Sequence, residues 1–287
     1  MKILYILFIG IVVISACFYQ HSVDASDAQT DYETGLRYYN SQDYAEALKW
    51  FRKAADQGDA IAQACLGEMY IVGKGVTKDY AQALKWFRKA ADQGNDMAQW
   101  LLGDMYILGL GVTQNYAQAL KWYRKAADQG NAMAQAALGS MYSLGHGVTQ
   151  NYAQALKWYH KSADQGDAVA QVCLGEMYYT GEGVTEDYSE ALRWFRKSAD
   201  QGNADAQRFL GLMYHKGRGV TQDYVEALKW FRKGADQGNA MAQTCLGFSY
   251  YYGDGISKNL TEATNWFRKA AAQDEQIALW MMKKLTE

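Results

Sequence analysis

The sequence predicts an all-α protein, a right-handed α-solenoid built from helix-turn-helix repeats. Tryptophan recurs seven times at intervals of 36 residues, from Trp50 to Trp266, with no insertion or deletion between the copies. Glycine recurs at the same interval from Gly67 to Gly247, and the 287 residues include no proline. A fixed period of this length is typical of arrays in which each helical pair buries its apolar face only against its neighbours. Such an architecture favours a binding function.

The N-terminal residues have the pattern of a secretory signal, because Met1-Lys2 is followed by an unbroken apolar run from Ile3 to Ile14. The segment Ile14-Ser15-Ala16-Cys17 resembles the lipobox of bacterial lipoproteins, whereas Val23-Asp24-Ala25 would suit ordinary signal peptidase. A retained anchor is a third alternative, although about 17 apolar residues is short for roughly 30 Å of hydrocarbon. All three alternatives place the repeats outside the cytoplasm.

The lipobox interpretation sets the expected domain organisation. It makes residues 1–16 a signal peptide with its lipobox at 14–17, Cys17 the lipidated residue, and residues 17–30 a linker. Residues 31–275 then form the repeats, and residues 276–287 form a C-terminal capping helix. We expect a capping role because Lys283 stands where the recurring glycine is expected, 36 residues after Gly247. No second helix is predicted after it to pack against that position.

Each repeat is predicted to contain a first helix, a loop and a second helix. In one unit these are residues 62–70, 71–78 and 79–94. The second helix begins at Asp79 with Gln82 three residues later, which is a capping box, and Gly94 after it suits the left-handed position. Its apolar residues share one face, at spacings of three and four: Ala83, Trp86, Phe87 and Ala90.

A glycine is predicted to lie inside each first helix, at Gly67 in this unit. A mid-helix glycine costs roughly 1 kcal/mol relative to alanine, so its regular recurrence indicates that a neighbouring helix approaches too closely for a side chain. We expect the ring of Trp86, and of its equivalents in the other repeats, to occupy that space.

These residues resemble the Sel1-like repeat family, whose members are relatives of the tetratricopeptide repeat with a longer loop. The shared pattern is A-Q-x-x-L-G-x-M-Y-x-x-G-x-G-V-x-x-[DN]-Y-x-x-A-L-x-W-[FY], and the resemblance covers about residues 31–287, with six units in register. The opening unit departs from the pattern, because residues 39–43 lack the G-x-G-V loop and Gly35 precedes Gly67 by only 32 residues. That unit is similar to a plain tetratricopeptide unit instead.

Positions that are identical in every repeat hold the units together, so the variable positions are the candidates for partner binding. Five variable columns lie on one stripe of the first helix. The resemblance implies that this stripe lines a concave groove, where we expect a protein or peptide partner. The predicted groove residues are Glu68, Trp100, Asp104, Glu176, Tyr179, Arg208, His215, Lys216, Phe248, Tyr251 and Tyr252. Trp100 is expected to be exposed, and the alternative is that these columns vary without a function.

Other ligand classes find little support in the sequence. The net charge of −2 gives no reason to expect a nucleic-acid partner, and the K-W-[FY]-R-K runs are interpreted as last-turn cations that the helix dipole favours. The G-x-G loops lack the Lys-Ser/Thr of a phosphate loop. No metal and no cofactor is expected, because the histidines show no metal-ligand or catalytic spacing: His21, His146, His160 and His215. Membrane contact is expected only through the lipid anchor or signal segment.

The cysteines bear on an enzymatic alternative. Cys65, Cys173 and Cys245 occupy one column of different repeats, farther apart than the ~7 Å Cα limit for a disulfide, and are expected to be buried thiols. The resemblance offers a β-lactamase or penicillin-binding activity, described for some exported, cysteine-rich Sel1-like proteins. Those members carry paired cysteines in each repeat, which this chain lacks. The predicted function is therefore a non-catalytic interaction scaffold of the bacterial cell envelope.

Overall fold

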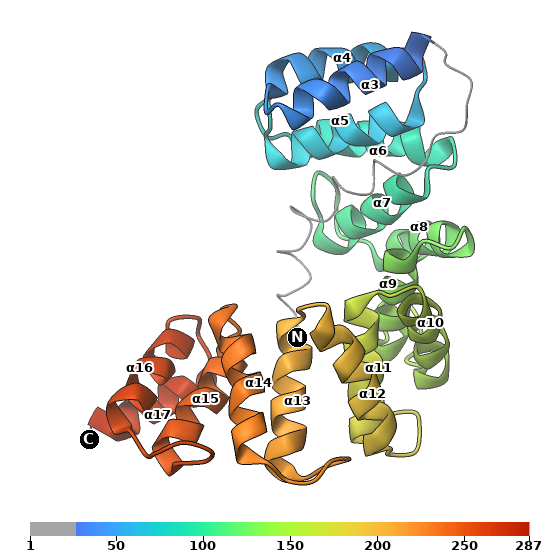
Figure 1. Ribbon diagram of the computed structural model, residues 1–287. Coiled ribbons are helices and arrows are strands. Elements are labelled where there is room, and N and C mark those ends of the chain that lie inside the picture. Colours follow the sequence, from blue (N-terminus) through green and yellow to red (C-terminus); the bar gives the residue numbers. More distant parts are fainter. Residues whose placement is uncertain (1–26, 287) are drawn as a thin grey trace. The chain divides into compact units, whose positions relative to one another are not determined.

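The computed structural model describes residues 27–286, and fifteen α-helices with no strand make up the ordered elements of this part of the chain (Figure 1). The first helices of the repeats are α3 (Asp27–Asn40), α5 (Ala60–Val72), α7 (Asp96–Leu108), α9 (Ala132–Leu144), α11 (Ala168–Thr180), α13 (Ala204–Lys216), α15 (Ala240–Tyr252) and α17 (Gln276–Thr286). The second helices are α4 (Tyr44–Asp56), α6 (Tyr80–Asp92), α8 (Tyr116–Asp128), α10 (Tyr152–Asp164), α12 (Tyr188–Asp200), α14 (Tyr224–Asp236) and α16 (Leu260–Ala271). The prediction of an all-α solenoid of helix-turn-helix repeats is confirmed. The expected signal peptide, lipobox and Cys17 lie outside the described residues.

The described residues fall into two compact units. Unit 1 contains residues 27–141 and 145–149, and unit 2 contains residues 142–144 and 150–286. Within each unit, helices pack on their neighbours in the chain, for example α6 on both α5 and α7, and α14 on both α13 and α15. Each repeat is therefore stabilised by its nearest neighbours, as in other repeat arrays.

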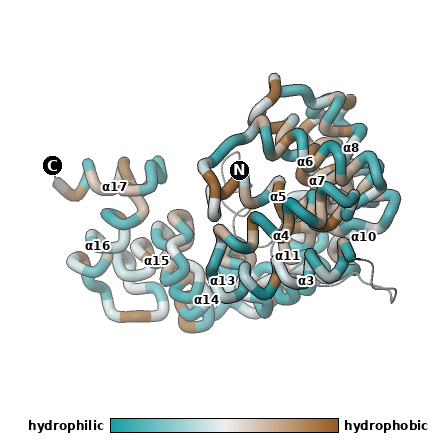
Figure 2. The backbone as a smooth tube through the Cα atoms, turned by 90° about the horizontal axis from the view of Figure 1, so that it is seen from above, coloured by the Kyte–Doolittle hydropathy of each residue, from teal (hydrophilic) through white to brown (hydrophobic). Residues whose placement is uncertain are grey.

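Local hydrogen bonds explain where the helices begin and end. The Asp79 carboxylate accepts bonds from the backbone N–H groups of Ala81 and Gln82, at 2.9 and 3.0 Å, and so caps α6. After this helix Gly94 has a φ of 94°, and Asn95 then caps α7 by accepting the N–H of Ala98 at 2.8 Å. Apolar and polar residues are interspersed along the second helices (Figure 2). In α6 the buried residues recur at spacings of three and four, so they share one face that packs against the neighbouring helices.

The helix glycines pack against a different ring from the expected one. A Cβ atom on Gly67 would lie 2.5 Å from the Phe87 ring, and Phe87 itself is completely buried. The same pairing joins Gly103 to Tyr123 and Gly175 to Phe195. The expectation that Trp86 fills this space is therefore wrong. Successive residues point about 100° apart around a helix, so only one of the two neighbouring rings can face the first helix.

The first repeat differs from the others in its connection. Helix α3 begins at Asp27, inside the range 17–30 that was expected to be a linker, and an acidic residue in a first turn is favoured by the helix dipole. The connection from α3 to α4 has only the three residues 41–43, where Gln42 takes a φ of 64°. This short turn replaces the loop of seven residues, 73–79, that joins α5 to α6.

Helix α17 closes the described part of the array. Its N-terminus is capped by Glu275, whose carboxylate accepts the N–H of Ala278 at 2.6 Å. Ala278 and Met281 are buried in a cluster with Leu246 of α15 and Phe267 of α16. One face of α17 is thus fixed to the preceding repeat.

Candidate interaction surface

A buried glutamine in each first helix connects neighbouring repeats. Gln99 donates to the carbonyl of Ala91 at 3.1 Å, and its side-chain oxygen accepts a 2.8 Å bond from Gln129 of the next turn. The same arrangement recurs around Gln63, Gln171, Gln207 and Gln243. The first repeat uses Asp31 instead, which accepts from Gln57 at 2.6 Å. These glutamines have a structural role that sequence reasoning missed, although their recurrence at intervals of 36 residues from Gln63 to Gln243 was the available signal.

The cations of the second helices also make internal contacts. Arg88 donates to the Tyr106 hydroxyl at 2.8 Å, and Arg196 donates to that of Tyr214 at the same distance. The ammonium group of Lys89 lies 4.4 Å from the centre of the Trp86 ring, a contact that recurs along the array. These basic residues therefore join one repeat to the next or cover a tryptophan, which leaves less of their charge for a ligand.

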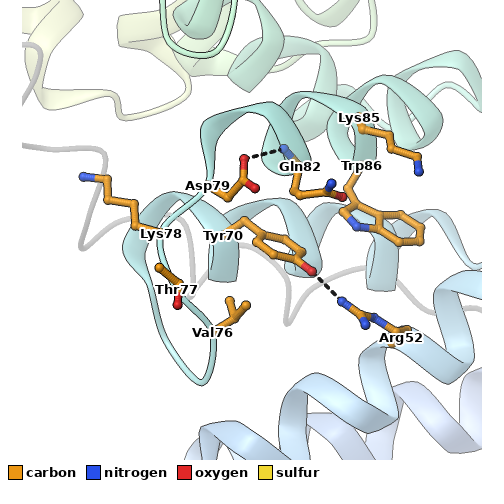
Figure 3. A pocket seen from close by; sticks show the side chains of 9 residues that line it. All are labelled: Arg52, Tyr70, Val76, Thr77, Lys78, Asp79, Gln82, Lys85 and Trp86. Carbon is orange, nitrogen blue, oxygen red and sulfur yellow. Dashed lines mark hydrogen bonds between the residues drawn. The ribbon is translucent and has the colours of Figure 1, made fainter.

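A cavity of about 570 Å³ lies between Arg52 and Trp86 in unit 1 (Figure 3). It is lined by Arg52 of α4, Tyr70 of α5, the loop residues Val76, Thr77, Lys78 and Asp79, and Gln82, Lys85 and Trp86 of α6. The Arg52 guanidinium donates to the Tyr70 hydroxyl across the cavity, as the dashed line in Figure 3 shows. Arg52 is therefore already bonded within the protein, and the ammonium group of Lys78 lies over the Tyr80 ring, 4.8 Å from its centre.

In unit 1 the predicted groove residues are mostly covered. Trp100 is only 6% exposed, so the expectation of an exposed tryptophan is wrong. Asp104 is buried one turn later, where it accepts a hydrogen bond from the Tyr123 hydroxyl. Burial raises the pKa of Asp104 to about 7. Glu68 is half-buried. This part of the stripe is therefore largely closed to solvent, and Asp104 contacts the second helix of its own repeat.

In unit 2 a charged pair lies on the stripe. Glu176 on α11 and Arg208 on α13 are both half-buried, and burial raises the pKa of Glu176 to about 7 despite the opposing charge of Arg208. The Arg208 guanidinium lies 3.8 Å from the centre of the Phe209 ring, and its Nε is buried without a hydrogen-bond partner. A desolvated donor of this kind is costly unless it meets an acceptor.

Two other predicted groove residues are bound to loops of the following repeat. The Tyr179 hydroxyl accepts a 2.8 Å bond from Arg218, and His215 lies 3.0 Å from an oxygen of Asp254. In unit 1, Lys74 donates to Tyr39 in the equivalent way, at 2.8 Å. The variable residue at the centre of each of these G-x-G loops therefore pairs with a variable residue at the end of the preceding first helix. Tyr179 and His215 have an inter-repeat role as well as their place on the stripe.

The exposed part of the predicted surface lies at the C-terminal ends of α13 and α15. Lys216 is exposed and Tyr252 is 64% exposed. The Phe248 and Tyr252 rings stack with centres 6.0 Å apart, and Tyr251 meets Tyr252 edge to face at 4.9 Å. These three aromatic residues form a cluster at the end of one rigid helix, which is the feature of the stripe best placed to meet a partner.

The thiols show no sign of catalytic activation. Cys65 is buried and Cys173 and Cys245 are half-buried, and no disulfide joins them. Burial raises the pKa of Cys173 to about 12 and that of Cys245 to about 11. Within residues 27–286, no group of three or more His, Cys, Asp or Glu side chains is placed to hold a metal ion. None of the helices in the same range is both long and apolar enough to cross a membrane.

Comparison with known families identifies the repeat. A Sel1 repeat model matches seven consecutive segments, at residues 28–59, 60–95, 96–131, 132–167, 168–203, 204–239 and 240–275. The chain therefore belongs to the Sel1 repeat family. The first segment is matched although it lacks the longer loop. The fold is a Sel1 repeat scaffold, which commonly serves protein-protein interaction.

Solved structures give the same result. A protective antigen of uropathogenic Escherichia coli with an SLR fold is 44% identical and matches 90% of this chain with a TM-score of 0.74; this chain spans 56% of that protein. A Sel1 repeat protein from Oxalobacter formigenes is 35% identical over 84% of this chain and 96% of its own length, with a TM-score of 0.79. An immunity protein from Pseudomonas aeruginosa, 22% identical over 76% of this chain and 84% of its own, shares the fold at a TM-score of 0.52. A comparison with curated proteins gave no match.

Proposed function

We propose that this protein is a non-catalytic scaffold of the bacterial cell envelope that binds a protein or peptide partner on the first helices of unit 2. The observation that carries the proposal is the aromatic cluster of Phe248, Tyr251 and Tyr252, whose outermost ring is 64% exposed. Tyrosine and phenylalanine supply much contact area for little loss of side-chain entropy, which is why they recur at binding sites.

The charges near this cluster define the partner more closely. Lys216 is exposed on α13, and the Nε of Arg208 on the same helix has no acceptor. An acidic side chain of a partner would pair with the exposed Lys216, while apolar side chains would pack on the aromatic rings. We therefore propose a peptide segment that carries carboxylates beside apolar residues.

The helices that present these groups are held rigidly by the glutamine and Arg-Tyr bonds between repeats. A preordered surface loses little conformational entropy on binding, so a modest number of contacts can give a specific complex. Non-catalytic binding also fits the thiols, since raised pKa values keep Cys173 and Cys245 protonated at neutral pH.

The double substitution Tyr251→Ala and Tyr252→Ala tests the site. We expect it to weaken capture of a specific envelope protein by at least tenfold, because truncation of two central aromatic residues of an interface typically costs more than about 2 kcal/mol. The measurement is photocrosslinking in intact cells from a reactive residue at position 248, followed by affinity measurement with the captured protein.

Tyr38→Ala is the matched control, because Tyr38 is also an exposed tyrosine but lies on α3 of unit 1. Helicity should be unchanged in both variants. Equal affinity of the double variant and the wild-type chain would refute binding at the aromatic cluster. Trp100→Ala is unsuited to this test, because Trp100 is buried and its loss would affect stability first.

A further inference from the structure

Helix α17 carries large apolar side chains that are about half exposed. Ile277, Leu279 and Trp280 are 52%, 41% and 57% exposed, whereas Ala278 and Met281 of the same helix are buried against the preceding repeat. Ile277 and Trp280 are three residues apart and share one face of the helix, where they form an exposed apolar patch of the kind that marks a protein interface.

The repeat register shows what this face is shaped to contact. Trp280 occupies the column of Val172 and Thr244, which are only 8% and 4% exposed in unit 2. In that column the Thr244 hydroxyl donates at 2.8 Å to Glu275, immediately before α17. The column is therefore where each first helix meets the following repeat. Leu279 of α17 stands at the repeat position that Gln243 occupies in α15. It offers apolar contact in place of the hydrogen bonds that Gln243 makes to Ala235 and Gln273.

The two ends of the array do not match each other. The exposed side of α3 is mainly polar, with Asp27, Glu33 and Arg37 among its exposed residues. Head-to-tail stacking of copies would bury these charges against Ile277 and Trp280, which costs free energy without compensation. A suitable partner must instead present an apolar surface of the same shape.

We propose that α17 pairs with α17 of a second copy of this chain, antiparallel and across a two-fold axis near Trp280. The charges of the helix support this direction. Asp274 is exposed before its first turn, and Lys283 and Lys284 are exposed in its last turn. Antiparallel pairing brings the lysines of one copy beside the acidic turn of the other at both ends, whereas parallel pairing brings like charges together.

The interface is small, because one helix of eleven residues provides less than the roughly 800 Å² per partner of a standard complex. The expected dimer is weak, forming above roughly 10 μM.

Sedimentation velocity of the purified full chain tests the pairing, in a mild detergent so that the apolar run of residues 3–14 does not drive association. The wild-type chain should change from monomer to dimer as concentration rises, and Trp280→Lys should weaken dimerisation at least tenfold. Val72→Lys is the matched control, since Val72 is also an exposed apolar residue at the end of a helix, α5. A wild-type monomer at all concentrations, or a dimer that Trp280→Lys leaves intact, would overturn the proposal.

Cysteine crosslinking in a Cys17→Ser background tests the direction of the helices. Trp280→Cys should form a disulfide-linked dimer by itself, because position 280 lies nearest the two-fold axis. Gln276→Cys should crosslink efficiently only when mixed with Lys284→Cys, since these positions lie opposite each other in the antiparallel pair. Efficient crosslinking of Gln276→Cys to itself would mean a parallel pair and would contradict the proposal.

Discussion

Phe87 and its equivalents explain why a residue with poor helix propensity recurs inside the first helices. The ring lies where a Cβ atom on Gly67 would have to be, so the two helices of a repeat pack closely only with glycine at this point. Tyr123 takes the same place over Gly103. The adjacent tryptophan has a separate role, because its ring lies under a lysine ammonium group.

Gly67→Ala should destabilise the protein by about 1–3 kcal/mol, because the added methyl group meets the Phe87 ring at 2.5 Å. At an unobstructed helix position the same change stabilises by roughly 1 kcal/mol. Urea unfolding followed by circular dichroism measures the effect. Phe87→Leu should relieve much of the cost in a double-mutant cycle, whereas Trp86→Leu should not. Relief by Trp86→Leu alone would make the tryptophan, and not Phe87, the partner of the glycine.

The buried Asp104 should make stability depend on pH. Its pKa is raised to about 7, so between about pH 4 and 7 the folded protein holds a proton that the unfolded chain releases. This stabilising contribution is present at low pH and is lost as pH rises through 7. We expect the free energy of unfolding to fall over this range by up to a few kcal/mol.

Asp104→Asn should flatten this dependence, because the amide cannot ionise but keeps an oxygen to accept the Tyr123 hydroxyl. Glu176 is a second group with a raised pKa of about 7, so Glu176→Gln should remove a further part of the slope. The measurement is urea unfolding at pH 5 and pH 8. An unchanged slope in Asp104→Asn would show that Asp104 is ionised in the folded protein across this range.

Among the helices, each buried glutamine joins its own first helix to the second helix before it and to the turn that ends its own repeat. Gln99 on α7 connects the carbonyl of Ala91 on α6 with the side chain of Gln129 after α8. One buried amide thus satisfies polar groups from the helices on either side. The Arg88-Tyr106 bond adds a second link between α6 and α7.

Gln99→Leu should destabilise unit 1 by about 1–3 kcal/mol, because a buried leucine can make neither the bond to the Ala91 carbonyl nor the bond to Gln129. Gln129→Ala is the comparison, and we expect a smaller loss of about 0.5–1.5 kcal/mol, since Gln129 is exposed and water can replace it. Thermal unfolding would measure both. Equal losses of stability would mean that the bond from Gln99 to the Ala91 carbonyl adds little to the stability of unit 1.

At the scale of the whole molecule, we propose an exported, envelope-anchored protein. The support is the apolar run Ile3–Ile14 and the lipobox-like segment ending at Cys17, both outside the described residues.

Cys17→Ser should move the protein from the membrane fraction to the soluble envelope fraction, because a lipidated cysteine supplies the anchor in this interpretation. Cell fractionation with immunodetection measures the change, and Cys65→Ser serves as the control at a buried cysteine. Unchanged membrane association of Cys17→Ser would remove the lipoprotein assignment and leave a retained signal segment as the anchor.

Parts of the candidate surface were predictable and parts were not. Tyr252 and Lys216 are exposed at the ends of first helices, where the spacing of variable columns placed them. Trp100 lies on the same stripe yet is only 6% exposed, and which residues of a stripe are covered depends on the packing between helices and not on spacing along one helix. The bond between Tyr179 and Arg218 joins residues 39 positions apart, a distance that helical periodicity does not describe.

The sequence by itself determined the repeat, its helices and their ends, since capping groups, turn glycines and apolar periodicity act between residues close along the chain. Asp79 and Gly94 occupy the helix ends that their residue types indicate. Only the tertiary structure decided that Phe87 rather than Trp86 meets Gly67, that Trp100 is covered, and that Trp280 is open. These outcomes depend on how closely neighbouring helices approach, which packing of whole side chains fixes and local spacing does not.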